Sequence, residues 1–348
     1  MNPSALGGPG GNFSFFYYRP GFSASDLILL KFSQIMTTLT LTVYCCGTVS
    51  NTAIILVLLK GGFKLTTNIC FFALAIVDFL VSASWIPKLL NFQSVFGYHG
   101  SFIVLRISRA YLQPLGEALQ TVGSWITAIV AMERLCCIMF PLKVRLIFTR
   151  TSSVCLILAG VAYETIVMSV FFYGNSIRER AINIYTQQNR TVANYEEYSA
   201  RYEYGSDIQV RASMAGSFGP NYGLYGLIII ETVVLVIVFT RSVRARAVLV
   251  ANQGTTKMST KEVRLIKSVI AVCVIYIVTC SPQNVFGTLL RVNIQAADGR
   301  LFWPLTYFAR SLNHVMNIFA YLSMNAHFRA QFRSLFCFCC PGGLPATK

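Results

Sequence analysis

The sequence predicts an all-α integral membrane protein, a bundle of seven transmembrane helices followed by a short amphipathic eighth helix. The chain has 348 residues, of which 55% are hydrophobic and only 12% are charged, and its mean hydropathy is +0.58. Soluble domains carry about 25% charged residues, so this composition excludes an ordinary soluble protein. The net charge of +16 arises because acidic residues are scarce, 13 against 29 Lys and Arg. It therefore does not indicate a nucleic-acid partner.

Seven apolar segments reach the length of about 20 residues that a spanning helix needs. The first ends at Lys60-Gly61-Gly62, and the third is long enough to project from the bilayer. The predicted spans are 32–59, 66–89, 102–140, 151–173, 221–240, 264–290 and 301–324. They make up a transmembrane domain, 32–325, between an extracellular N-terminal segment, 1–31, and a cytoplasmic amphipathic helix and tail, 326–348. No internal repeat is visible, whereas transporters commonly have one.

Basic residues lie in alternate loops, which sets the orientation because Lys and Arg are retained on the cytoplasmic side. The segment from Arg241 to Lys267 is the most basic, whereas the loop 174–220 balances five Arg against five acidic residues. The sequence thus predicts a multi-pass plasma membrane protein with an extracellular N-terminus. The sequons at Asn12 and Asn189 fall on the extracellular side and predict glycosylation there. The first 25 residues lack the pattern of a cleavable signal peptide.

Polar residues form stripes along three of the predicted helices, and the cost of charge in lipid directs such stripes to the bundle interior. At 3.6 residues per turn each set shares one helix face. The plainer interpretation is polar contact between helices without further function. The stripes are Gln113, Glu117, Gln120, Ser124, Thr127 and Arg134; Tyr276, Thr279, Cys280, Gln283 and Asn284; and Arg310, Asn313, Asn317 and Tyr321, with His314 beside them.

Short motifs follow one another along these helices in a recognisable order. They are Gly47-Thr48-Val49-Ser50-Asn51, Leu74-Ala75-Ile76-Val77-Asp78, Glu133-Arg134-Leu135, Pro282, and Asn317-Ile318-Phe319-Ala320-Tyr321 with Phe328 seven residues later. Over 51–328 the chain resembles rhodopsin-like (class A) G-protein-coupled receptors, and it is most similar to molluscan chemosensory-type and neuropeptide receptors. The resemblance implies that an agonist swings the sixth helix outward about Pro282 and opens a groove for a heterotrimeric G protein.

The resemblance also implies three groups of site residues. The switch comprises Glu133, Arg134, Glu262, Pro282, Asn317 and Tyr321, in which either glutamate can pair with Arg134. A polar core of Asn51, Asp78, Asn313 and Asn317 surrounds an allosteric sodium ion in relatives; here Gly123 replaces a serine of that site, so sodium and ordered water remain alternatives. No other cofactor or metal is expected. Palmitoylation of Cys337, Cys339 and Cys340 would anchor the tail to membrane lipid, and plain apolar packing is the alternative.

The predicted ligand site lies in the extracellular half of the bundle and consists of Gln113, Glu117, Gln283, Asn284, Tyr307 and Arg310. The resemblance implies a peptide or a small chemosensory molecule as the ligand. Gly116 replaces the aspartate of amine receptors, so a biogenic amine is disfavoured. At about 1.5 Å rise per residue, Glu117 and Arg310 differ in depth by an amount that a long arginine side chain could nearly cover. Three alternatives remain for them: pairing with each other, pairing of Arg310 with Asp78, or direct contact with the ligand.

Several departures from the family pattern keep a second function open. Arg109 and a loop without cysteine replace the usual extracellular disulfide, Cys280 replaces a tryptophan of the sixth helix, and Ile318 replaces the proline of the seventh. The alternative is therefore a non-signalling or decoy receptor with the same fold. An enzyme is not expected, since no arrangement of a nucleophile, a metal site or a phosphate-binding loop is present. The seventh helix has no lysine for a retinal Schiff base.

Overall fold

The computed structural model describes residues 24–63, 66–92, 111–140, 143–173, 175–185, 191–202, 207–253, 260–292, 299–324 and 326–336, with the side chains of part of them. Nearly all of this is helix. The helices are α1 (Ala24–Gly61), α2 (Thr66–Phe92), α4 (Gln113–Met139), α5 (Val144–Ile147), α6 (Arg150–Tyr173), α7 (Asp207–Gln253), α8 (Thr260–Val292), α9 (Gly299–Met324) and α10 (Ala326–Phe336).

Within the described ranges, six helices are long and apolar enough to cross a membrane. The corresponding stretches are Lys31–Gly61, Thr66–Pro87, Pro114–Met139, Arg150–Ser169, Asn221–Ala245 and Ile266–Val285. They confirm the architecture of a helical membrane protein and agree with the first, second, fourth, fifth and sixth predicted spans and with most of the third. The part of the third predicted span that precedes residue 111 lies outside the described residues.

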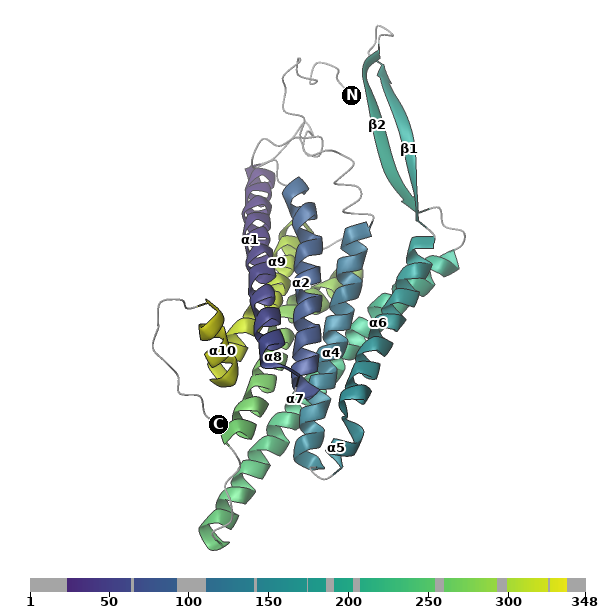
Figure 1. Cartoon of the computed structure of the whole chain (residues 1–348). Coiled ribbons are helices and arrows are strands. Elements are labelled where there is room, and N and C mark those ends of the chain that lie inside the picture. Colours follow the sequence, from purple (N-terminus) through teal and green to yellow (C-terminus); the bar gives the residue numbers. More distant parts are fainter. Residues whose placement is uncertain are drawn as a thin grey trace.

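The long helices pack side by side along one common direction (Figure 1). Helix α4 occupies a central position, because it contacts α2, α6, α7 and α8. Helix α9 lies between α1 and α8 and contacts both. It is 26 residues long but is not one of the six apolar helices, since it carries the buried polar side chains of Arg310, Asn313, His314 and Asn317.

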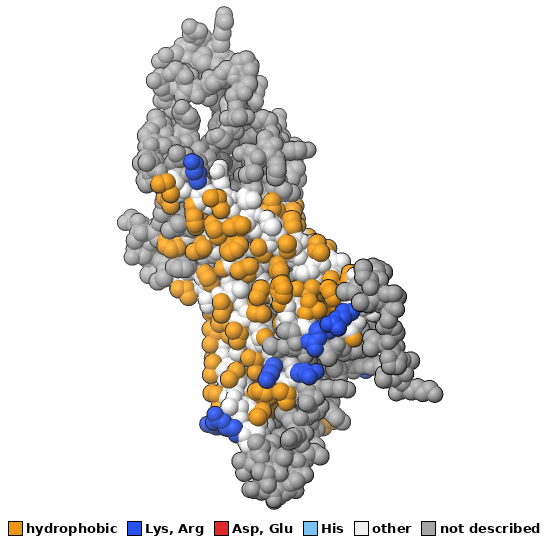
Figure 2. Space-filling view, turned by 90° about the vertical axis from the view of Figure 1, so that its left-hand side faces the viewer, with side chains coloured by type: hydrophobic (Ala, Val, Ile, Leu, Met, Phe, Trp, Pro, Cys, Tyr) orange, Lys and Arg blue, Asp and Glu red, His pale blue; other side chains and the backbone are white. Residues whose placement is uncertain are grey.

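The surface of the bundle differs from that of a soluble protein, and its interior contains polar side chains beside a hydrophobic core. Large apolar side chains point outward, including Val49 at 71% exposure and Val278 at 63%, while Asn51 and Arg310 are fully buried. Figure 2 shows a broad hydrophobic surface on one side of the bundle, with most of the basic side chains of this side in its lower half. Lipid solvates apolar side chains and disfavours charges, so this distribution fits a bundle surrounded by hydrocarbon.

Helix α10 is the short helix that the sequence predicts after the last long one. Its Phe328 ring packs on Tyr321 of α9 with the ring centroids 5.6 Å apart, and the rings of Phe332 and Phe336 continue the row. The Nζ of Lys60, at the end of α1, donates a hydrogen bond to the Oγ of Ser334 at 3.1 Å. These contacts hold α10 against α1 and α9 at one end of the bundle (Figure 1).

A β-hairpin, which the sequence analysis did not anticipate, follows α6. Its strands, β1 (Asn175–Tyr185) and β2 (Thr191–Tyr202), pair antiparallel, with Asn175 opposite Tyr202 and an irregularity at Ile184 and Tyr185. Figure 1 shows the hairpin extending beyond the helices, at the end of the bundle opposite α10. The strands are joined by backbone pairing between 175–185 and 191–202, a segment in which the sequence has no cysteine.

Close packing of α4 on α6 depends on a glycine. The indole of Trp125 lies against Gly160, where a Cβ would overlap the ring, and its Nε1 donates a hydrogen bond to the carbonyl oxygen of Leu156 at 2.8 Å. The indole is rigid and tied to the backbone of α6, so it cannot move aside easily. Gly160 thus permits the close approach of the two helices.

Gly160→Ala is therefore expected to destabilise the protein by about 1–3 kcal/mol, the usual cost of overpacking. Thermal melting of the purified protein in lipid nanodiscs measures the effect. Gly226→Ala in α7 is the matched control, because a Cβ there meets no atom within 4 Å. Equal melting temperatures for the two variants would contradict this account of the α4–α6 contact.

Candidate functional site

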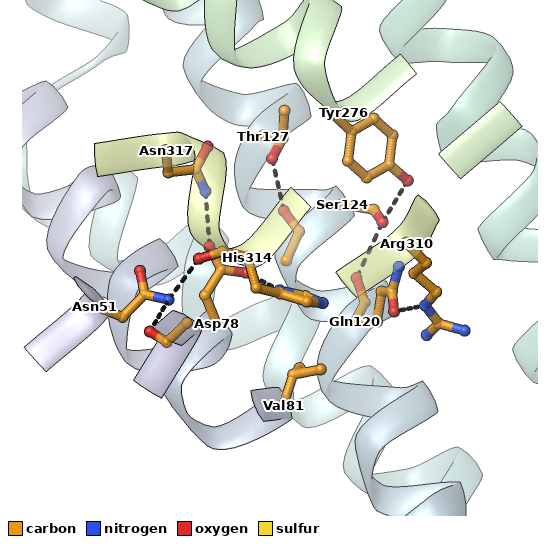
Figure 3. Close-up of polar contacts among 12 residues, drawn as sticks. Asn51, Asp78, Val81, Gln120, Ser124, Thr127, Tyr276, Arg310, His314 and Asn317 are labelled. Carbon is orange, nitrogen blue, oxygen red and sulfur yellow. Dashed lines mark hydrogen bonds and ion pairs between the residues drawn. The ribbon is translucent and has the colours of Figure 1, made fainter. Parts of the chain in front are cut away.

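Three groups of polar side chains, most of them buried, follow one another along the interior of the bundle. We name them the Arg310 cluster (Glu117, Gln120, Gln283, Arg310), the Asp78 cluster (Asn51, Asp78, His314, Asn317) and the Arg134 pair (Glu133, Arg134). Figure 3 shows the Asp78 cluster and part of the Arg310 cluster. The Arg310 and Asp78 clusters join residues that are far apart in the sequence, whereas Glu133 and Arg134 are neighbours.

The Arg310 cluster connects α9 to α4 and α8. The Nη1 of Arg310 donates to the Oε2 of Glu117 at 2.6 Å and to the Oε1 of Gln283 at 2.8 Å. Its Nε donates to the Oε1 of Gln120 (Figure 3). A buried guanidinium requires such partners, because an unpaired charge in the interior is costly. A single side chain therefore holds three helices together.

The ion pair of this cluster is asymmetric. The Arg310 side chain is 1% exposed, whereas that of Glu117 is 32% exposed, so the carboxylate is the accessible member of the pair. The guanidinium also lies over the Trp85 ring, 6.0 Å from its centroid, in cation–π geometry. Of the three alternatives for Glu117 and Arg310, mutual pairing is the one observed, and Arg310 does not pair with Asp78.

Other predicted ligand residues lie close to the Arg310 cluster. The ring of Tyr307 packs against those of Trp85 and Trp303, with centroids 5.1 and 5.9 Å away. Asn284 lies half-buried on α8, next in sequence to Gln283. The side chain of Gln113 lies outside the described residues. The structure thus brings Glu117 and Gln283 into direct contact with Arg310. Tyr307 lies beside Trp85, and the guanidinium of Arg310 lies over the Trp85 ring.

The Asp78 cluster joins α1, α2 and α9. Both carboxylate oxygens of Asp78 are bound: Oδ2 accepts a hydrogen bond from the Nδ2 of Asn317 at 2.7 Å, and Oδ1 lies 2.8 Å from the Nδ1 of His314. The Nδ2 of Asn51 donates to the His314 carbonyl oxygen at 2.8 Å (Figure 3). Asn51, Asp78 and Asn317 thus come together as the sequence predicts.

His314, which the sequence analysis placed beside the polar stripe of the seventh predicted helix, was not included in the predicted polar core. The prediction placed Asn313 in the polar core, but Asn313, although buried, is not among the described residues that bind Asp78. The signal was present in the spacing. His314 follows Arg310 by four residues and precedes Asn317 by three, which puts all three on one helix face.

The Arg134 pair lies near the other end of α4. The Nη2 of Arg134 is 3.2 Å from the Oε1 of Glu133, and the hydroxyl of Thr67 donates to both carboxylate oxygens at 3.1 and 3.2 Å. All three residues are buried. Glu133 therefore ties Arg134 to the start of α2. Of the remaining switch residues, Tyr321 is buried against Phe71, with ring centroids 4.8 Å apart.

Contacts between α4 and α8 connect the region of Arg310 with the middle of α8. The hydroxyls of Ser124 and Tyr276 are 2.6 Å apart (Figure 3). The Nε2 of Gln120 lies 3.8 Å from the Sγ of Cys280. Pro282 is inside α8, between Cys280 and the Arg310 partner Gln283. Cys280, two residues before Pro282, and Gln283, directly after it, therefore both contact residues of the Arg310 cluster.

The remaining predicted sites fall beyond the described residues. Asn12, Asn189, Cys337, Cys339 and Cys340 lie outside the described residues, as does the side chain of Glu262. In the part of the chain that the structure describes, no group of three or more His, Cys, Asp or Glu side chains could hold a metal ion.

Comparison with known proteins assigns no function, so the function is inferred from the chemistry of these residues. No protein-family model matches the chain, and no curated protein matches it.

Proposed function

We propose that this protein is a rhodopsin-like G-protein-coupled receptor that transmits the binding of an extracellular peptide or small chemosensory molecule to heterotrimeric G proteins. The observation that carries the proposal is the Arg134 pair: a buried arginine near the end of α4, bound only to Glu133 among the described residues. In the family that the sequence resembles, the arginine of this motif contacts the G protein.

The proposal includes α9 as a seventh transmembrane helix. Its 26 residues are enough to cross a bilayer, and its polar side chains are buried in contact with α1, α2, α4 and α8 rather than exposed to lipid. The end of the bundle with α10, Lys60 and Arg333 would face the cytoplasm. The hairpin and the N-terminus would then lie outside the plasma membrane.

In the proposed mechanism the ligand acts on the Arg310 cluster. A ligand that contacts the partly exposed Glu117 carboxylate weakens or shifts the ion pair between Glu117 and Arg310. Gln283 is bound to the same guanidinium and follows Pro282 directly, so the change reaches α8 at its proline. The cytoplasmic half of α8 then moves away from Arg134. This path replaces the tryptophan contact that Cys280 cannot make.

The nature of the ligand is constrained at Gly116. A Cβ at this position would lie 2.7 Å from the Oγ of Ser84 and 2.8 Å from the Nε1 of Trp85. An aspartate, which amine receptors have here, would therefore collide with α2. This supports a ligand other than a biogenic amine.

The test is G-protein activation in transfected cells, with each G-protein class expressed separately and with panels of neuropeptides, amino acids and waterborne odorants. A ligand-dependent response in at least one class is the expected result. Silence in all classes at verified surface expression would favour the second candidate, a decoy receptor. That candidate is supported by Cys280 and Ile318, which replace two family residues of the activation pathway.

A further inference from the structure

The Asp78 cluster departs from the sodium site that the family resemblance implies. A hard cation requires several oxygen ligands, including the free lone pairs of a carboxylate. Both oxygens of Asp78 are already bound, Oδ1 to His314 and Oδ2 to Asn317. Each oxygen keeps a second lone pair, but the groups bound to the carboxylate are an imidazole nitrogen and an amide N–H rather than the oxygen ligands that a hard cation prefers, so the residues present fit a sodium ion poorly at this carboxylate.

The surroundings of the carboxylate agree with this conclusion. Gly123 replaces the serine that relatives provide, and a Cβ there would meet only Val77 and Leu74 carbons, at 3.5 and 3.8 Å. The atoms around Gly123 are thus apolar and supply no ligand for a cation. Asn313, the fourth residue of the predicted set, does not join the described contacts of Asp78.

We propose that the imidazole of His314 takes the place of the cation and keeps sodium out of the Asp78 cluster. The His314 and Asp78 side chains are 1% and 3% exposed and only 2.8 Å apart, so the ring nitrogen occupies the position that an ion would need. The ring of Tyr44 stacks on the imidazole, with centroids 5.9 Å apart. Gly47 lets α1 approach α2 closely, because a Cβ there would lie 2.9 Å from the Oγ of Ser82, and it neighbours His314, whose Cβ would be 3.7 Å away.

Removal of the imidazole would leave a set of oxygens suited to sodium. It frees the Oδ1 of Asp78, and three further buried oxygens in this region have no hydrogen-bond partner among the described residues: the Oδ1 atoms of Asn51 and Asn317 and the Oγ of Ser82. Ser82 lies near the cluster, since its Oγ is 2.9 Å from a Cβ placed on Gly47, which also neighbours His314. His314→Ser should therefore create a sodium site around Asp78.

Thermal melting of the purified full chain in nanodiscs tests the proposal, with sodium chloride compared with N-methyl-D-glucamine chloride at equal ionic strength. The wild type should melt at the same temperature in both salts. His314→Ser should melt about 2–5 °C higher in sodium, as expected for a bound ligand, and Asp78→Asn in that background should remove the difference. The measurement requires no agonist and no G protein, so its outcome is independent of the proposed function.

Two results would overturn the inference. One is a sodium-specific rise in the melting temperature of the wild type that Asp78→Asn abolishes. The other is a His314→Ser protein that folds, judged by a single cooperative transition, yet responds equally to both salts. If His314→Ser does not fold, ²³Na NMR of the wild type decides: no line broadening beyond that of the Asp78→Asn protein supports the proposal, and broadening lost in Asp78→Asn overturns it.

Discussion

Arg310→Met is expected to lower the melting temperature by about 4–8 °C. The loss of one member of a fully buried ion pair costs about 3 kcal/mol or more, but the charge left here, Glu117, is partly exposed, which reduces the cost to about 2 kcal/mol. The substitution leaves Glu117, Gln120 and Gln283 without their common donor. Methionine keeps most of the apolar volume of the side chain, so the effect reports the lost contacts rather than a cavity. Thermal melting in nanodiscs measures it.

Arg241→Met in α7 is the matched control, since Arg241 is exposed and its replacement should change the melting temperature by little. A double-mutant cycle with Glu117→Gln isolates the ion pair itself, because the coupling between two residues in contact appears as non-additivity. If the two side chains pair, Glu117→Gln must lower the free energy of unfolding much less in the Arg310→Met background than in the wild type. Strict additivity of the two substitutions would contradict the pairing.

Glu133→Gln is expected to raise basal G-protein activation about tenfold, which corresponds to about 1.4 kcal/mol. The Oε1 of Glu133 lies 3.2 Å from the Nη2 of Arg134. A hydrogen bond to a charged group contributes about 1.5–3 kcal/mol. An amide binds the guanidinium more weakly, so Arg134 is released toward the G protein more often. Nucleotide exchange by a purified G protein, without added ligand, measures the change.

Thr67→Val is the companion variant for this prediction. It retains the charge of Glu133 but removes the hydroxyl that donates to both of its carboxylate oxygens, so it should raise basal exchange less than Glu133→Gln does. Basal exchange that falls or stays constant in Glu133→Gln, at equal amounts of folded protein, would show that this pair does not restrain Arg134.

The apolar part of the fold could be predicted from the sequence because it depends on local composition. The six apolar helices follow from uninterrupted runs of about 20 apolar residues. Helix α10 follows from the spacing of Phe328, Phe332 and Phe336. The hairpin could not be predicted in this way, because the segment 175–202 mixes charged and apolar residues without a regular alternation.

The polar interior could be predicted only in part. Helical spacing identified the faces that carry Glu117 and Arg310, and the reach of a long arginine side chain made their pairing one of three alternatives. It could not select among them, since the choice depends on how α4, α8 and α9 are rotated about their axes. The partner of Asp78 shows the same limit: His314 and Asn313 are adjacent in sequence, and a small rotation of α9 decides which one faces the carboxylate.

Packing contacts of single glycines were beyond sequence reasoning for a related reason. Gly160 and Gly116 are unremarkable as sequence positions, because a glycine inside an apolar helix has several explanations. Their roles become apparent only with the side chains that lie against them, Trp125 from α4 and Trp85 from α2. Both are long-range contacts that local patterns do not encode.

Nucleotide exchange by G proteins on the wild type and on Arg134→Ala, in membranes with matched receptor levels, addresses the proposed function itself. A receptor requires that exchange on the wild type, basal or with a ligand from the panels, exceed that of membranes without the protein, and that Arg134→Ala reduce the excess at least tenfold. A folded Arg134→Ala protein that supports exchange as well as the wild type would contradict the proposed role of Arg134 and with it the assignment as a G-protein-coupled receptor.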